Sequence, residues 1–123
     1  MPYRIYHAGD VLRIDLAGIV TNAEFAEMVG KVNQLESSGP VVPHRIADFS
    51  QSSELIISYP AIMAAAQLRK ALKFPNNFRS AIVATLPGHV SVARTFATLN
   101  DHPQISIRVF PTLAEAQAWI AGD

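Results

Sequence analysis

The sequence predicts one α/β domain over residues 1–123, in which a mixed five-stranded sheet carries about four helices, mainly on one face. Three observations lead to this prediction: two adjacent β-rich segments at the start, the alternation of helical and strand segments after them, and polar–apolar alternation within two strands. A chain of 123 residues has the size of one domain and buries enough surface for one core.

Two strands joined by a tight turn open the predicted fold. Residues 3–7 and 11–20 are rich in β-branched and aromatic residues, and the turn formers Gly9 and Asp10 lie between them. We therefore expect an antiparallel hairpin.

A capping box marks the start of the first helix. Thr21 and Glu24 have the spacing at which the threonine side chain accepts from the backbone N–H of the glutamate and the glutamate side chain accepts from the backbone N–H of the threonine. The helix ends at the Ser-Gly-Pro of residues 38–40. Lys31 and Glu36 take positions outside the apolar stripe and are expected in solvent. That stripe consists of Phe25, Met28, Val29, Val32 and Leu35.

A third strand and a second helix follow. Residues 41–49 read as a strand with an irregular start, because Pro43 cannot donate to a neighbouring strand. Residues 51–58, polar and then briefly apolar, are assigned to neither a helix nor a strand. Pro60 fits the first turn of a helix that ends before residues 75–77.

The last four elements alternate between strand and helix. Residues 79–85 contain a continuous apolar run, which is typical of a strand covered on both faces. A helix over residues 89–100 and an alternating strand over 105–110 follow. Thr112 and Glu115 repeat the capping spacing and start a short C-terminal helix. The predicted order is ββαβαβαβα.

Alternation within the strands indicates a partly polar sheet face. In the second strand, Leu12 and Ile14 oppose Arg13 and Asp15. Right-handed crossovers make the later strands parallel, and we expect their helices on the apolar face. The polar face is then left to solvent or to a second subunit.

Composition excludes some classes of partner and site. Ten basic and ten acidic residues give no net charge, which argues against nucleic acid because phosphate backbones require a basic surface. The chain has no cysteine and no signal-peptide layout at its start, so we expect a cytoplasmic protein without a disulfide or thiolate metal site. No long apolar run predicts a membrane span. The absence of net charge also favours self-association.

The whole pattern resembles the SpoIIAA-like group of STAS-type domains, which includes many uncharacterised bacterial proteins. The most specific part is the ending, Val-Phe-Pro-Thr-Leu-Ala-Glu-Ala at residues 109–116 with Trp119 and Ile120. The resemblance implies a regulatory module that binds a protein partner.

The best-known members of that group are anti-sigma factor antagonists. In them, a serine in an Asp-Ser-Ser-Gly context, at the start of the helix after the third strand, is phosphorylated to switch partner binding. Ser58 is the nearest match here, but Ile57 and Tyr59-Pro60 replace the aspartate, serine and glycine. We therefore do not expect this phosphorylation switch at Ser58.

Residues near the ends of the third and fourth strands form the predicted ligand or partner site. Ligands of parallel α/β sheets bind at this edge. The four histidines have no metal-ligand spacing, and we expect no metal and no cofactor. The site residues are Asp48, Ser50, Ser58, Tyr59, His89 and Ser91.

A local basic cluster lies around the end of the predicted second helix. Arg69, Lys70, Lys73 and Arg79 are close in sequence and are expected on the surface, where they would face solvent, an acidic partner or a second copy of the chain.

Three hypotheses about function remain. The first is a non-enzymatic interaction or regulatory module that self-associates. The second, by analogy with CRAL-TRIO domains, is binding of a small apolar or lipid-like ligand in a pocket of about 300 Å³ or more, near residues such as Tyr59, Met63 and Phe96. The third is a small hydrolase or transferase with a serine nucleophile, His89 as base and Asp48 as its orienting carboxylate.

Overall fold

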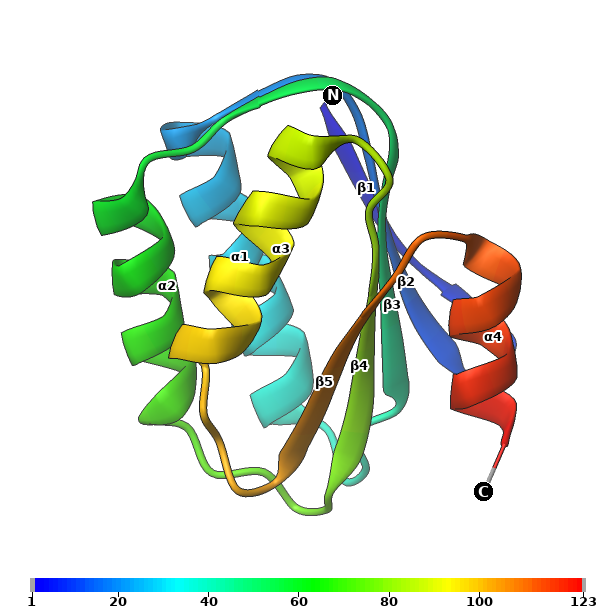
Figure 1. Ribbon diagram of the computed structural model, residues 1–123. Helices are drawn as coiled ribbons and strands as arrows, with labels where there is room; N and C mark the ends of the chain where they lie inside the picture. Colours follow the sequence, from blue (N-terminus) through cyan, green and yellow to red (C-terminus); the bar gives the residue numbers. More distant parts are fainter. Residues whose placement is uncertain (1, 123) are drawn as a thin grey trace.

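The computed structural model describes residues 2–122, which form one five-stranded sheet flanked by helices (Figure 1). The order of elements is the predicted one. The elements are β1 (Tyr3–Ala8), β2 (Val11–Thr21), α1 (Asn22–Ser38), β3 (His44–Ile56), α2 (Tyr59–Lys70), β4 (Phe78–Val83), α3 (Pro87–Leu99), β5 (Ile105–Phe110) and α4 (Leu113–Ala121).

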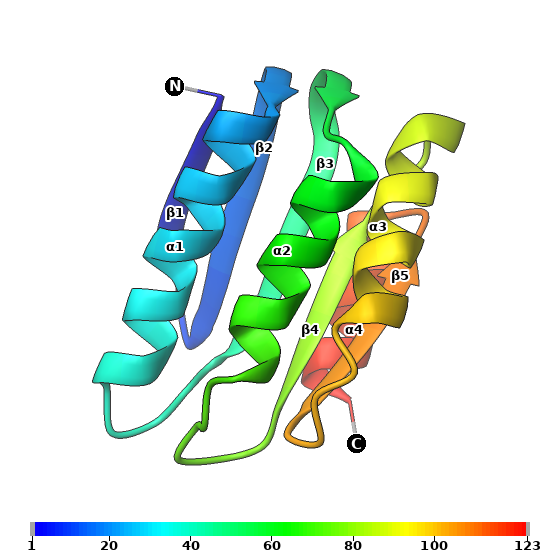
Figure 2. The same ribbon diagram turned by 90° about the vertical axis from the view of Figure 1, so that its left-hand side faces the viewer.

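The strands lie in the sheet in the order in which they occur in the chain. β1 and β2 pair antiparallel, and β2 to β5 are mutually parallel. Each crossover leads to the next strand in the same direction, so right-handed connections place α1, α2 and α3 on one face (Figure 2). α4 makes no crossover and packs on the other face, against β3, β4 and β5 (Figure 1). The predicted mixed sheet is confirmed.

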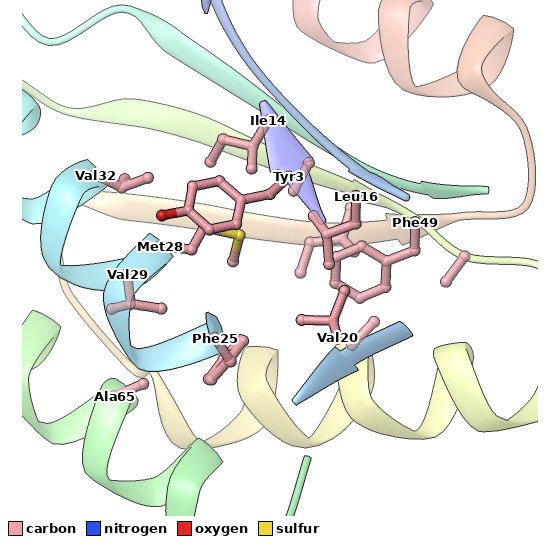
Figure 3. Packing of buried hydrophobic residues seen from close by; sticks show 14 residues of the cluster. Tyr3, Ile14, Leu16, Val20, Phe25, Met28, Val29, Val32, Phe49 and Ala65 are labelled. Atoms are coloured by element: carbon pink, nitrogen blue, oxygen red, sulfur yellow. The ribbon is translucent and has the colours of Figure 1, made fainter. Parts of the chain in front are cut away.

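The main core lies between the sheet and the layer of α1, α2 and α3. Alternate residues of the strands and one stripe of α1 meet there (Figure 3). A second cluster joins α4 to the opposite face through Ile46, Ala81, Val83, Ala116 and Ile120. β4 is therefore covered on both faces, as its apolar run predicts. The main core includes Tyr3, Ile14, Leu16, Val20, Phe25, Met28, Val29, Val32, Phe49 and Ala65.

β2 and β3 continue beyond the rest of the sheet as a two-stranded ribbon, formed by residues 17–21 and 51–56. β3 pairs with β4 only as far as Asp48, whereas its pairing with β2 continues to Ile56. The register shifts on both sides of residues 17–18, and Gly18 has φ +64°, a conformation that favours glycine. The ribbon curves toward the starts of α1 and α2 in Figure 1.

The third strand differs from its prediction at both ends. It begins at His44 rather than residue 41, since Pro43 has no N–H and the Val42 N–H donates to the Asn76 side chain at 2.7 Å. It also includes residues 51–56, which the sequence left unassigned. β2 supplies the hydrogen-bonding partner for this polar segment.

Two charged residues expected in solvent are buried. Glu36 and Arg69 are each 1% exposed, while Leu35, expected in the core, is 46% exposed. Successive helix residues point about 100° apart, so turning Glu36 inward turns Leu35 outward. Glu36 faces inward because Arg45 of β3 and Arg69 of α2 both bind its carboxylate.

Candidate functional site

Four large apolar side chains are exposed along the edge where the parallel strands end. Ile19 belongs to the ribbon, Ile56 ends β3, Tyr59 begins α2 and Leu86 precedes α3. Each is between 51% and 54% exposed. We call these four residues the apolar rim. The starts of α1, α2 and α3 lie at the same end of the molecule in Figure 1.

Hydrogen bonds fix the backbone in the middle of the rim. The Ser58 hydroxyl accepts from the Ala61 N–H at 3.3 Å and caps α2. The Ser58 N–H donates to Asn22 Oδ1 at 2.8 Å, and Asn22 Nδ2 donates to the Ser58 hydroxyl at 3.2 Å. Ser58 therefore joins the first residue of α1 to the start of α2, while remaining exposed to solvent.

His89 lies beneath the rim rather than on it. It is 3% exposed, and its ring packs edge-to-face on Phe49 with 6.3 Å between ring centroids. Neither ring nitrogen has a hydrogen-bond partner within residues 2–122. Burial lowers the pKa of His89 below its ordinary value of 6.5, so the ring is neutral at neutral pH.

Asp48 lies on the opposite face of the sheet from His89. The adjacent residue, Phe49, points toward His89, and side chains alternate along a strand. Asp48 accepts from the Ser50 N–H at 2.9 Å and lies 3.6 Å from Arg13. The predicted combination of serine, His89 and Asp48 is therefore not assembled in the described part of the chain, because the sheet separates the acid from the imidazole and no serine there bonds the imidazole.

The predicted polar sheet face is confirmed on β1 and β2. The Tyr6 hydroxyl donates to Asp15 at 2.6 Å, and Arg13 binds Asp15 at 2.7 Å and Asp48 at 3.6 Å. Arg4 lies 4.5 Å above the Tyr6 ring. Opposite charges thus face one another on this part of the sheet, although Arg13 Nε has no hydrogen-bond partner within residues 2–122.

The six predicted site residues thus fall into separate places. Ser58 and Tyr59 lie at the rim, His89 lies beneath it, Asp48 and Ser50 are at the start of the ribbon, and Ser91 is exposed on α3. Sequence reasoning missed Ile19, Ile56 and Leu86. The signal was there, since each is a large apolar residue next to a strand end or turn.

The space that Phe96 lines is smaller than the predicted apolar pocket. Its volume is about 50 Å³, and neither Tyr59 nor Met63 lines it. Tyr59 points into solvent with 54% of its surface exposed. A lipid-like ligand needs roughly 300 Å³ or more and does not fit in this cavity.

Within residues 2–122, no three histidine, aspartate or glutamate side chains gather where they could hold a metal ion. None of the helices in that part of the chain has the length and apolar character needed to cross a membrane.

Comparisons with known proteins identify the fold. No protein-family model matches the sequence, and no curated protein sequence matches it. An uncharacterised protein of the DUF3478 family with a SpoIIAA-like fold, from Shewanella loihica, is 15% identical over 97% of this chain and 92% of that one, with a TM-score of 0.60. The anti-sigma factor antagonist SpoIIAA in its unphosphorylated form is 15% identical over 98% and 99%, with a TM-score of 0.61.

An anti-sigma factor antagonist from Mycobacterium paratuberculosis is 14% identical over 98% of this chain and 93% of that one, with a TM-score of 0.59. Identities of this size establish the fold alone. The chain therefore has the SpoIIAA-like α/β fold, as the sequence resemblance implies.

Proposed function

We propose that this protein is a non-enzymatic regulatory module that binds a separate protein through the apolar rim. The observation that carries the proposal is the exposure of four large apolar side chains along one edge. Several large apolar side chains exposed along one edge are typical of interaction surfaces, and a tyrosine supplies both apolar area and a hydroxyl.

The geometry of the ribbon supports this role. Ile19 pairs with Glu54, two residues before Ile56, so the two isoleucines project from the same face. The backbone pairing of the ribbon fixes the positions of Ile19 and Ile56. The hydrogen bonds between Asn22 and Ser58 fix the start of α2, where Tyr59 lies. A surface that is ordered before binding loses little conformational entropy when a partner docks.

The fold supports a partner that is a different protein. Two of the similar structures are named antagonists of an anti-sigma factor, and such a name describes action on another protein. The separation of Asp48 from His89 by the sheet, and the unbonded nitrogens of His89, favour binding over the hydrolase or transferase hypothesis.

The test is affinity capture from a lysate of the source cells with three forms of the protein. Ile56→Asp places a charge in the rim, whereas Leu68→Asp places one on an equally accessible part of α2, where Leu68 is 62% exposed. We expect wild type and Leu68→Asp to retain the same protein and Ile56→Asp to lose it, with unchanged melting temperatures. Equal capture by all three forms would contradict the proposal.

Sedimentation velocity on the same three forms separates a different partner from a second copy of this chain. Where wild type self-associates, as its lack of net charge favours, we expect Ile56→Asp to leave that association intact, because the rim binds a separate protein. A dimer that Ile56→Asp alone dissociates would make the rim a self-association surface and would overturn the assignment to a separate protein.

A further inference from the structure

A buried cluster of charged residues holds the ends of α1 and α2 against the sheet. Arg45 Nη1 donates to both Glu36 oxygens at 3.1 and 3.2 Å, and Arg69 Nη2 donates to Glu36 Oε1 at 2.6 Å. Arg45 also donates to the Ser80 hydroxyl at 2.8 and 3.2 Å, and Arg69 to Asn33 at 2.6 Å. The two arginines and Glu36 are at most 4% exposed.

The charges in this cluster do not balance. Two guanidinium groups share one carboxylate, which leaves one positive charge in excess. Burial lowers the pKa of Arg45 to about 10, which still leaves it charged at neutral pH. Arg69 Nε is buried and has no hydrogen-bond partner within residues 2–122. A buried charge without a counter-charge is costly, so an additional anion would stabilise the cluster.

A cavity of about 50 Å³ adjoins the arginines. Its polar lining residues are Arg45, Arg69 and Ser80, and Glu36 does not line it. The other guanidinium nitrogens of the two arginines already donate hydrogen bonds, so Arg69 Nε is the one left without a partner within residues 2–122. The other walls are apolar and come from the sheet, α1 and α3, including Ile14, Phe25, Val29, Val92 and Phe96. Ile14, Phe25 and Val29 appear in Figure 3, between the sheet and α1. Arg45, Arg69 and Ser80 therefore lie against one end of the cavity, while nearly all of the surface that faces the cavity is apolar.

We propose that this cavity binds a short-chain monocarboxylate of the size of acetate or propionate. The carboxylate lies against Arg45, Arg69 and Ser80, and the alkyl end lies among the apolar walls. A single negative charge neutralises the excess, and guanidinium groups bind planar carboxylates well. Since one water-sized group needs roughly 10–15 Å³ of such space, about three to five non-hydrogen atoms fit, and acetate has four and propionate five.

The same geometry predicts which related molecules bind poorly. A neutral alcohol of the same length fills the apolar end but leaves the charge excess in place. Chloride supplies the charge but leaves the apolar walls without contacts. A longer fatty acid does not fit in about 50 Å³.

The test compares sodium propionate, sodium chloride, sodium octanoate and 1-propanol by isothermal titration calorimetry and thermal unfolding, at equal ionic strength for the salts. We expect saturable 1:1 binding of propionate. At about 100 times its Kd, propionate raises the melting temperature by about 10 °C. The other three additives do not give this saturable shift.

Three variants locate the site. Arg69→Met removes the excess charge and leaves the Arg45–Glu36 pair, so propionate binding weakens by at least about tenfold. Ala47→Leu keeps every charge but fills the cavity that Ala47 lines, and it also abolishes binding. Arg94→Met removes an exposed arginine of α3 and leaves binding unchanged. If either cavity variant fails to fold, NOEs between bound propionate and the Val29 and Val92 methyl groups of wild type provide the test.

Two results would overturn the proposal. The first is an equal response to propionate and chloride, which would show an effect of salt rather than recognition of a carboxylate. The second is propionate binding that Arg69→Met and Ala47→Leu leave intact, or wild-type NOEs to residues outside the cavity, since either would place the ligand elsewhere.

Discussion

Glu36→Gln removes one charge from the buried cluster and alters little else. Glutamine has nearly the same shape, and its amide oxygen still accepts a hydrogen bond from one arginine. The change leaves Arg45 and Arg69 buried together without a counter-charge, and the two guanidinium groups then repel each other. The variant thus measures how strongly this carboxylate holds the two helices to the sheet.

The expected loss of stability is large. Removing one partner of a buried ion pair typically costs about 3–5 kcal/mol, because the other charge remains buried and unpaired. Glu36 and Arg69 are each 1% exposed, so solvent does little to screen the charges that remain. For a chain of this length the melting temperature falls by roughly 4 °C per kcal/mol, which predicts a decrease of about 12–20 °C.

Urea unfolding followed by circular dichroism at pH 7 measures this loss. Glu27→Gln is the matched control, because Glu27 lies on the same helix but is exposed, where its ion pair with Lys31 contributes little, and glutamine still accepts the hydrogen bond from the Tyr3 hydroxyl. The double variant Glu36→Gln/Arg69→Met also removes one of the two positive charges that Glu36→Gln leaves unpaired, and we expect it to recover part of the loss. If Glu36→Gln lowers the free energy of unfolding by less than about 1 kcal/mol, the reasoning is refuted, because the buried carboxylate would then contribute no more than an exposed ion pair.

Two further predictions concern residues at and beneath the rim. The pKa of His89 in the folded chain lies below 6.5, its ordinary value in the unfolded chain. As the pH falls through 6.5, the imidazole therefore takes up a proton in the unfolded chain but not in the folded one. The free energy of unfolding then declines by at most about 1.4 kcal/mol per pH unit. His89→Leu removes this contribution, so urea unfolding between pH 7.5 and 5 should show a flatter profile than wild type, and parallel profiles would contradict the assignment. Ser58→Ala removes the cap of α2 and the hydrogen bond from Asn22, which should lower the free energy of unfolding in urea by about 1 kcal/mol without loss of the fold. An unchanged free energy of unfolding would mean that the cap contributes nothing.

Local signals in the sequence predict most of the fold. The Thr21 N–H donates to Glu24 at 3.0 Å, and the Glu115 N–H donates to Thr112 at 3.2 Å, so both capping spacings mark real helix starts. Such signals act within a few residues and are readable without the tertiary structure. The order of elements follows from them, and the handedness of crossovers then places three helices on one face.

The ribbon could not be predicted in the same way. Residues 51–56 alternate poorly, and their place in a strand depends on pairing with residues 17–21, about 35 positions earlier in the chain. The bulge near Gly18 also breaks the period that links sequence to side-chain direction. Without the ribbon, the sequence could not show that Ile19 and Ile56 share a face.

The burial of Glu36 and Arg69 has a related cause. The helical spacing of apolar residues assigns charged residues to the solvent face. It cannot show that charged residues from distant parts of the sequence meet in the core. Here Arg45 comes from a strand, Glu36 from the helix before it and Arg69 from the helix after it. The prediction of a surface basic cluster is wrong for Arg69, because Glu36 offers it a buried carboxylate.

α1 and α2 are joined at both ends, by contacts of different kinds. At their starts, Asn22 and Ser58 share exposed hydrogen bonds between neutral groups, worth about 1 kcal/mol each. At their ends, Glu36 and Arg69 form a buried ion pair. Changes at the rim therefore alter what the surface presents while the ion pair continues to hold the helices, so rim variants test binding and cluster variants test the fold.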